Sequence, residues 1–240
     1  MEIKIFNSAA EASNFAALEL LRQIEGKVDS NLGVATGRTM DAIYHKFISH
    51  AREKTLDMNK VSAFAVDEYI GLVDESANSY KAYLDLHLFN QLNFDSGKVY
   101  IPNVGLQNID QACLDYEASI KNAGGIDFQL LGIGINGHIG LNEPGSSIDS
   151  RTRVVALTSS TRNSNKMVFS NENVPLTAIT IGIGTILEAS RCVMVATGLS
   201  KSDIVQKVVN GDINSKVPAT AIKQHPNAIL ILDKESAKLI

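Results

Sequence analysis

The run Asp127-Phe128-Gln129-Leu130-Leu131-Gly132-Ile133 leads, two residues later, into Asn136-Gly137-His138-Ile139-Gly140-Leu141-Asn142-Glu143-Pro144-Gly145. A short apolar run bounded by glycines is typical of a buried strand. In open α/β sheets, ligands bind beyond the carboxyl ends of such strands. We therefore expect the polar loop that follows, with its imidazole, carboxylate and two carboxamides, to lie where chemistry takes place.

Other parts of the chain repeat this alternation of apolar runs and amphipathic stretches. Runs typical of strands occupy 3–6, 32–36, 61–66, 128–133, 154–157, 178–181, 192–196 and 228–232. The pattern predicts helices over 8–24, where Ser8 and Glu11 form a capping box, and at about 39–51, 79–90, 109–122, 185–190 and 201–210. Alternation of this kind predicts an α/β fold with three layers: a mostly parallel, Rossmann-like sheet covered by helices on both faces. We expect residues 1–240 to form a single domain.

The loop also contains a dinucleotide-like pattern, Gly132-Ile-Gly134-Ile-Asn-Gly137. Such a motif requires a helix that opens at its third glycine, so that the helix N-terminus meets the pyrophosphate. Pro144 and Gly145 follow within eight residues and would interrupt that helix. The acidic residue expected about 20 positions later is absent as well. The pattern therefore does not predict NAD binding.

The composition excludes several classes of protein. Apolar residues make up 45% of the chain and charged residues 20%, as in an ordinary globular enzyme, and the net charge of −4 offers no basic footprint for nucleic acid. No apolar run approaches the roughly 20 residues needed to span a bilayer. The first residues lack the pattern of a signal peptide, and the two cysteines, Cys113 and Cys192, fit neither a disulfide framework nor a zinc site. We expect a cytoplasmic protein without a metal site.

Two further loops could bind an anion. Thr36, Gly37, Arg38 and Thr39 lie between a predicted strand and a predicted helix, and could offer N–H groups, hydroxyls and a guanidinium to a phosphate. An ordinary tight turn would explain the same residues. Lys201 follows another strand in the first turn of a helix, next to a capping box of Ser200 and Asp203. A cation there opposes the helix dipole, which a bound phosphate would explain, although a solvated surface lysine is the simpler interpretation.

Candidate acid–base groups lie on two strand ends. Asp67 follows an apolar run, where loss of water would make its carboxylate a better base, although Asp67 or Glu68 could instead cap a turn. His138 could exchange a proton near neutral pH, with Glu143 orienting its ring. Asn136 can only donate or accept hydrogen bonds. The glycines beside His138 permit close approach of a ligand, which favours a catalytic over a structural histidine.

Taken in order, these motifs resemble the glucosamine-6-phosphate deaminase/isomerase family along nearly the whole chain. The matching segments are 35–37, 66–69, 78–80, 131–145, 181–185, Gly198 with Lys201, and 225–226. The resemblance implies a cofactor-free enzyme that binds an amino-sugar phosphate. His138, helped by Asn136 and Glu143, would open the pyranose ring. Asp67 would then move the C2 proton to C1, and water would release ammonia and fructose 6-phosphate.

The chain departs from the family pattern at several positions. Many relatives have Asp in place of Asn136, and the family's phosphate-binding arginine falls at about Lys166 or Met167, where no arginine stands. Lys166 or Arg38 could replace it, but a lysine is not a bidentate fork. Ser146 and Arg153 match part of the allosteric site of longer relatives, which carry a lysine at the position of Val155. We therefore do not expect activation by an acetylated sugar phosphate.

Three alternatives to a glucosamine-6-phosphate deaminase remain open from the sequence. Galactosamine-6-phosphate deaminase/isomerases share Asn-Gly-His and Asn-Glu-Pro and would give tagatose 6-phosphate. A 6-phosphogluconolactonase would share the architecture but typically lacks Asn-Glu-Pro, so Glu143 argues against it. A non-catalytic sugar-phosphate sensor has no need to keep Asp67, His138 and Glu143 together. A homo-oligomer is possible, with no membrane or nucleic-acid partner.

Overall fold

A computed structural model describes residues 1–72, 76–166, 169 and 173–240. Its main feature is a seven-stranded sheet in the order β1-β10-β9-β6-β2-β3-β5, in which every pairing is parallel. The strands are β1 (Glu2–Phe6), β2 (Asn31–Val34), β3 (Ser62–Ala65), β5 (Val99–Tyr100), β6 (Phe128–Gly132), β9 (Arg191–Ala196) and β10 (Ala228–Asp233). The central strands β2, β6, β9 and β10 are almost wholly buried, which explains their continuous apolar runs.

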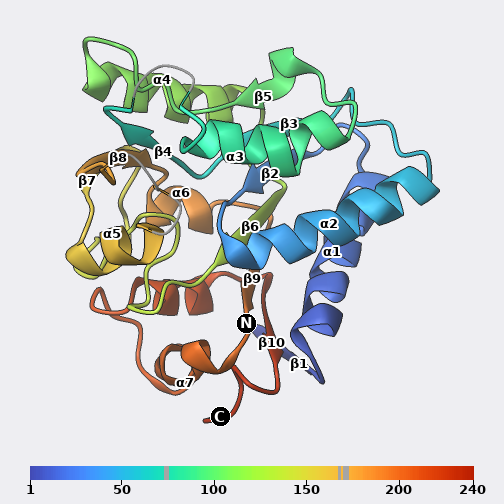
Figure 1. Ribbon diagram of the computed structural model, residues 1–240, viewed down its shortest axis with the longest axis vertical. Helices are drawn as coiled ribbons and strands as arrows, with labels where there is room; N and C mark the ends of the chain where they lie inside the picture. Colours follow the sequence, from blue (N-terminus) through green and yellow to red (C-terminus); the bar gives the residue numbers. More distant parts are fainter. Residues whose placement is uncertain (73–75, 167–168, 170–172) are drawn as a thin grey trace.

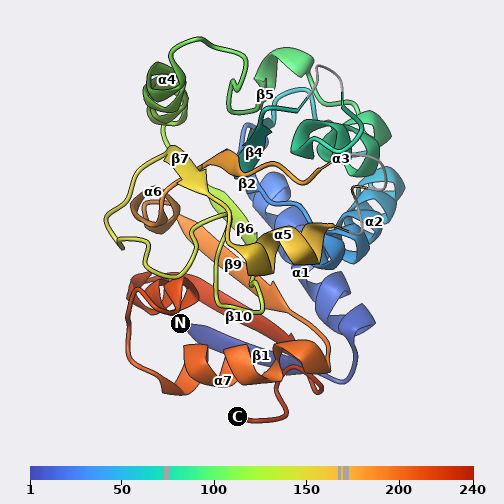
Figure 2. The ribbon, with the colours of Figure 1, turned by 60° about the vertical axis from the view of Figure 1, so that its left-hand side comes forward.

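Helices cover both faces of this sheet, so the predicted three-layer α/β fold is confirmed (Figures 1 and 2). On one face lie α1 (Ala9–Gly26) and α2 (Arg38–Glu53), which pack against each other. The other face carries α4 (Ile109–Asn122), α6 (Ile183–Leu187), α7 (Ser202–Asn210) and the 3-10 helix η4 (Pro218–Gln224). The chain moves from β2 to β3 in one direction and from β6 to β9 in the other. The sheet therefore has a topological switch point between β2 and β6, where α/β folds bind their ligands.

A second, smaller sheet was not predicted. It consists of β4 (Asp67–Ile70), β8 (Thr177–Thr180) and β7 (Arg153–Ala156), paired antiparallel in the order β4-β8-β7. The runs at 154–157 and 178–181 are strands as expected, but they do not belong to the parallel sheet. Val66 joins the two sheets, because its N–H donates to Val34 O and its carbonyl accepts from Ile181 N, at 3.0 and 2.8 Å.

Several predicted helices end or begin differently. The stretch expected at 79–90 divides into α3 (Tyr80–His87) and a 3-10 turn, η1 (Phe89–Gln91). The capping box of Ser200 and Asp203 is wrong: the chain enters α7 through the 3-10 turn η3 (Leu199–Lys201), which makes Lys201 the N-cap, without a capping side chain. The short helix α5 (Ser159–Asn165) was not predicted at all. Its residues are polar and poor helix formers, so no apolar periodicity marks it.

The described residues include no helix that combines the length and the apolar character needed to cross a membrane. Cys113 and Cys192 are both buried free thiols.

Asn142 fixes the loop after β6 to the rest of the fold. Its side chain is fully buried, and its Nδ2 donates to the carbonyls of Ile139 and Ile181, both at 2.9 Å. Its Oδ1 accepts from Arg153 Nη1, also at 2.9 Å. This carboxamide therefore connects the loop with β7 and with the segment that follows β8.

We predict that Asn142→Ala lowers the free energy of unfolding by at least about 2 kcal/mol, because it removes three buried hydrogen bonds, two to backbone carbonyls and one from a guanidinium. Urea denaturation measures the change. Asn59→Ala serves as the control: Asn59 is exposed, and its loss should cost no more than about 0.5 kcal/mol. Equal stability of the two variants would contradict the role given to Asn142.

Candidate active site

The loops singled out in the sequence meet at the end of the parallel sheet where its strands have their carboxyl termini, which we call the carboxyl edge. They follow the carboxyl ends of β9, β6, β2 and β3, which are consecutive strands in the sheet. Two contacts show how closely the loops approach. Lys201 Nζ, after β9, donates to the carbonyl of Ile133, after β6, at 2.5 Å. A β-carbon on Gly132 would lie 3.6 Å from Met40 Cε, in the first turn of α2.

Asp67 is buried beneath the loops of the carboxyl edge. It is the first residue of β4, opposite Thr180 of β8, and only 5% of it is exposed. Among the described residues, no hydrogen bond reaches its carboxylate. Loss of water, and secondarily the neighbouring charge of Glu68, raise the pKa of Asp67 to about 8. The carboxyl group therefore holds its proton more tightly than an ordinary aspartate and, once ionised, is a correspondingly stronger base.

Four tyrosines lie around Asp67 and make no hydrogen bond to it among the described residues: Tyr44, Tyr69, Tyr80 and Tyr116. Their hydroxyls are engaged elsewhere, since Tyr44 donates to Ala35 O at 2.6 Å, Tyr116 to Ala65 O at 2.7 Å and Tyr80 to Tyr69 at 2.8 Å. Burial is the largest cause that raises the pKa of each tyrosine, and the charge of Asp67 adds to it. These rings therefore form an apolar wall, and their hydroxyls make no hydrogen bond to the carboxylate in the described part of the structure.

Glu68 has a different task from its neighbour. Its Oε1 accepts from the N–H groups of Tyr69 and Tyr80, and its Oε2 accepts from Lys81 N, at 2.8 to 3.0 Å. Tyr80 and Lys81 are the first residues of α3, so Glu68 caps that helix from a neighbouring strand. Glu68 is therefore a cap, although of helix α3 and not of the turn that follows it as the sequence suggested, whereas no N–H of the described residues donates to Asp67.

The loop after β6 turns sharply and forms no helix. Gly137 N donates to Gly134 O and Gly134 N to His138 O, each at 2.9 Å. The His138 ring lies directly over Gly134, where a β-carbon would come within 2.2 to 2.5 Å of three ring atoms. This close approach requires a glycine at 134. The residues of the dinucleotide-like pattern therefore form a turn beneath the His138 ring and do not open a helix.

Glu143 organises the polar groups of this loop. Its Oε2 accepts from Asn136 Nδ2 at 2.8 Å and lies 3.7 Å from His138 Nδ1. Its Oε1 accepts from the N–H and the hydroxyl of Thr158, at 3.3 and 3.1 Å. Desolvation, opposed by the charge of Glu143 and assisted by Lys201, lowers the pKa of His138. The ring is therefore neutral at physiological pH and can accept a proton.

Gly140 brings the two halves of the site together. Its φ of +54° lets the loop pass against β3 and β4 without a side chain. A β-carbon there would lie 2.6 Å from Val66 Cγ1 and 3.6 Å from Asp67 Oδ2. The next residue, Leu141, donates its N–H to Thr180 Oγ1 at 3.1 Å. Asp67 and the loop of His138 therefore border the same space.

The residues predicted to bind a phosphate differ in their surroundings. Gly37 is the N-cap of α2 and provides no side-chain cap, an arrangement suited to an anion at the N-terminus of this helix. Lys201 is not a solvated surface lysine, because its ammonium donates to Ile133 O and burial lowers its pKa. Lys166 is exposed at the C-terminal end of α5, and Met167 lies outside the described residues.

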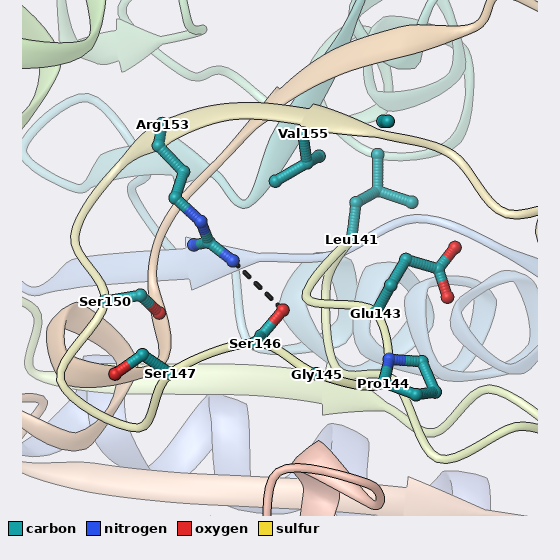
Figure 3. Close-up of a pocket in the computed structure, with 10 residues that line it drawn as sticks. Leu141, Glu143, Pro144, Gly145, Ser146, Ser147, Ser150, Arg153 and Val155 are labelled. Atoms are coloured by element: carbon teal, nitrogen blue, oxygen red, sulfur yellow. Dashed lines mark hydrogen bonds between the residues drawn. The ribbon is translucent and has the colours of Figure 1, made fainter.

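A cavity of about 460 Å³ lies on the other side of the Glu143 loop (Figure 3). Arg153 and Ser146 meet there, with Nη2 to Oγ at 3.0 Å, and Val155 contributes an apolar wall. Figure 3 shows the Glu143 carboxylate turned away from this pair. The expectation that an acetylated sugar phosphate does not activate the enzyme stays a prediction.

Sequence reasoning missed the residues that support the site. Thr158 and Thr161 contact Glu143 and His138 but carry no motif of their own. Tyr44 and Tyr116 also lie outside the matched segments, whereas Tyr69 and Tyr80 fall within them. Thr158 could have been found, because a threonine ahead of Ser159-Ser160-Thr161 fits a helix N-cap, and its hydroxyl does accept from Thr161 N at 3.2 Å. In the described part of the chain, no three His, Cys, Asp or Glu side chains gather as metal ligands would.

The fold and this site define an α/β enzyme that works at the carboxyl edge of a parallel sheet. Residues 7–231 match the family model of glucosamine-6-phosphate isomerases and 6-phosphogluconolactonases, and the chain belongs to this family.

Full-length relatives of the chain carry a more specific name than the family model does. The chain is 42% identical to the glucosamine-6-phosphate deaminase of Thermoanaerobacter pseudethanolicus, over 100% of the chain and 95% of the relative. It is also 42% identical to that of Clostridium botulinum strain Hall, over 99% and 98%. The solved structure of a monomeric glucosamine-6-phosphate deaminase superposes with a TM-score of 0.97 at 36% identity, over 100% of both chains. The 6-phosphogluconolactonase of Thermotoga maritima shares the fold, with a TM-score of 0.76 at 18% identity over 97% of the chain and 99% of the relative.

We predict that the free energy of unfolding of Asp67→Asn increases relative to that of the wild type as the pH rises. The pKa of Asp67 is higher in the folded protein (about 8) than its ordinary value of 3.8, so between these values the folded state binds more protons than the unfolded state. Wild-type stability attributable to this group is present below pH 4 and is lost as the pH approaches 8. Asparagine does not titrate. Urea denaturation at pH 5 and pH 8 should therefore show a larger advantage of the variant at pH 8; an equal difference at both values would contradict the raised pKa.

Proposed function

We propose that the protein deaminates and isomerises glucosamine 6-phosphate to fructose 6-phosphate and ammonia. The observation that carries this proposal is the position of Asp67, a buried base, beside the loop that holds the His138–Glu143 pair. The two sets of groups correspond to the two parts of the reaction: opening a hemiacetal and moving a proton between adjacent carbons. The names of the full-length relatives support the same substrate.

Ring opening falls to His138. The neutral imidazole accepts the proton of the C1 hydroxyl as the C1–O5 bond breaks, and it returns a proton to O5. The C1 carbonyl and the C5 hydroxyl are thereby formed with no net change in protons. Glu143 stabilises the transient imidazolium. Asn136 Nδ2 donates a 2.8 Å hydrogen bond to Glu143 Oε2 and so helps to fix the position of this carboxylate. Asn136 thus acts on the carboxylate and takes no part in proton transfer.

Isomerisation and loss of ammonia follow from the position of Asp67. The ionised carboxylate removes the C2 proton of the open-chain aldehyde while the carbonyl oxygen O1 gains a proton, giving an enolamine. Asp67 then delivers its proton to C1 as the amino nitrogen gives up one, so that a C1 hydroxyl and a C2 imine form with no net change in protons. Water adds to the resulting C2 imine and ammonia leaves, so that one water is consumed for each ammonia released. We expect the reaction to need no cofactor.

The phosphate of the substrate would bind at the carboxyl edge. Thr36, Gly37, Arg38 and Thr39 would hold it at the N-terminus of α2. Lys201 and Lys166 are the further candidates to supply a positive charge. Lys201 also supports Ile133 O, so its ammonium is positioned before the substrate arrives.

The two other enzyme classes are less well supported. The galactosamine epimer is not favoured, because the near full-length relatives are glucosamine-6-phosphate deaminases. Likeness to lactonases at 17–19% identity concerns the fold alone. The hydrogen bonds of Glu143 to Asn136 and Thr158 give that carboxylate a place in the site, and a lactonase loop typically lacks it.

The substrate can be tested directly. The purified protein is offered the 6-phosphates of glucosamine and galactosamine, and ammonia and ketose are measured. We expect ammonia and fructose 6-phosphate from the first substrate, with a rate that rises through pH 8 as Asp67 ionises. Asp67→Asn should lower turnover at least ~10²-fold, the usual contribution of a general base. Product from neither sugar would favour the sensor, and normal turnover of the variant would remove Asp67 from its role.

We predict that Lys201→Ala mainly raises KM. Loss of a charge-assisted phosphate contact costs roughly 1.5–3 kcal/mol, or about 10- to 150-fold in KM. Lys207→Ala is the matched control, since Lys207 lies exposed on the same helix. Steady-state kinetics with glucosamine 6-phosphate compares them; equal KM values would leave Lys201 with only its structural hydrogen bond.

A further inference from the structure

The first turn of α5 places two threonine hydroxyls between His138 and Glu143. Thr161 Oγ1 lies 3.4 Å from His138 Nδ1, and Thr158 Oγ1 lies 3.3 Å from Thr161 Oγ1. Thr158 Oγ1 is also 3.1 Å from Glu143 Oε1. Thr161 is almost completely buried, with 3% of it exposed. A continuous row of polar atoms therefore runs from the imidazole to the far oxygen of the carboxylate.

The number of protons available decides the direction of these hydrogen bonds. Each hydroxyl has one proton to donate. An ionised carboxylate can only accept, so Thr158 donates to Glu143 and has no proton left for Thr161. Thr161 must then donate to Thr158 if their contact is a hydrogen bond. The Thr161 oxygen is left as an acceptor for a proton on His138 Nδ1.

We infer that Thr158 and Thr161 are positioning residues that hold His138 as its Nδ1–H tautomer, with the Nε2 lone pair directed to the substrate. This inference rests on the proposed function for its use, because a ring that accepts the C1 hydroxyl proton at Nε2 needs its other proton on Nδ1. The direct path from Nδ1 to Glu143 Oε2 is 3.7 Å long, and Asn136 already donates to that oxygen. The row of hydroxyls gives the Nδ1 proton a nearer acceptor.

The helix that carries both hydroxyls is fixed at its two ends. Thr158 is its N-cap and accepts from Thr161 N. At the last residue of the helix, Asn165 Nδ2 donates to Tyr69 OH at 2.7 Å. Tyr69 stands two residues from Asp67 on β4. The same short helix thus contacts both halves of the site and keeps the hydroxyls in register with the imidazole.

Nitrogen-15 NMR of the imidazole tests the tautomer without relying on activity. A protonated and an unprotonated ring nitrogen resonate far apart, and the His138 signals are those missing from His138→Gln. We expect the neutral ring of the wild-type protein to carry its proton on Nδ1. Thr161→Val should weaken or reverse this preference, and Thr161→Ser should restore it. A wild-type ring protonated on Nε2, or a Thr161→Val ring with an unchanged tautomer, would overturn the inference.

Kinetics on the same proteins separates this inference from the proposed function. Thr161→Val should lower kcat/KM for glucosamine 6-phosphate about tenfold or more through kcat, a part of the 10²–10⁴-fold that acid–base catalysis contributes. KM should stay within about twofold, and Thr161→Ser should recover most of the activity. Ser159→Ala, on the exposed side of the same turn, is the matched control and should leave rate and tautomer unchanged. A wild-type protein inactive on the sugar would defeat the proposed function, while the NMR spectra would still decide the tautomer.

Discussion

A carboxylate that loses water without gaining hydrogen bonds holds its proton more tightly, and Asp67 is kept in that condition by the structure around it. Two sheets meet at Val66, so the chain passes from β3 into β4 without exposing the next residue. Four tyrosines close the space around it while their hydroxyls bond to other groups. Glu68, one residue away, is occupied with the N-terminus of α3. The site thus contains one strong base and few groups able to weaken it.

The topology explains why this base lies near an imidazole. The sheet reverses its order between β2 and β6, and the loops that follow these strands diverge at that point. The loop after β6 carries His138 and Glu143, and β3, which lies on the other side of β2, leads to Asp67. Gly140 allows the loop to pass close to Asp67 Oδ2. Under the proposed function, ring opening and proton transfer would therefore use groups that follow different strands of the sheet, and α5 contacts both sets of groups.

The sequence predicts the parallel sheet well because its strands are buried on both faces and stand out as apolar runs. It also singles out Asp67, His138 and Glu143, because acid–base groups at strand ends are few, and the structure brings these three residues to the same end of the sheet. The second sheet escapes prediction because β4 has four residues and follows β3 after a single residue, Val66. The helix α5 escapes because tertiary hydrogen bonds from Thr158 and Asn165 hold it, and these cannot be read from local pattern. The distinct tasks of Asp67 and Glu68 depend on α3, which is distant from them in sequence.

The central claim is that Asp67 is a buried base whose proton affinity is set by desolvation. Carbon-13 NMR of protein labelled at aspartate carboxyl carbons measures this directly, with Asp67→Asn identifying the signal. We expect the Asp67 carboxyl to titrate with a pKa of about 8 in the folded protein without substrate. Titration near the ordinary value of 3.8 would show that water or a hydrogen-bond donor reaches the carboxylate, and Asp67 would then not be a desolvated base.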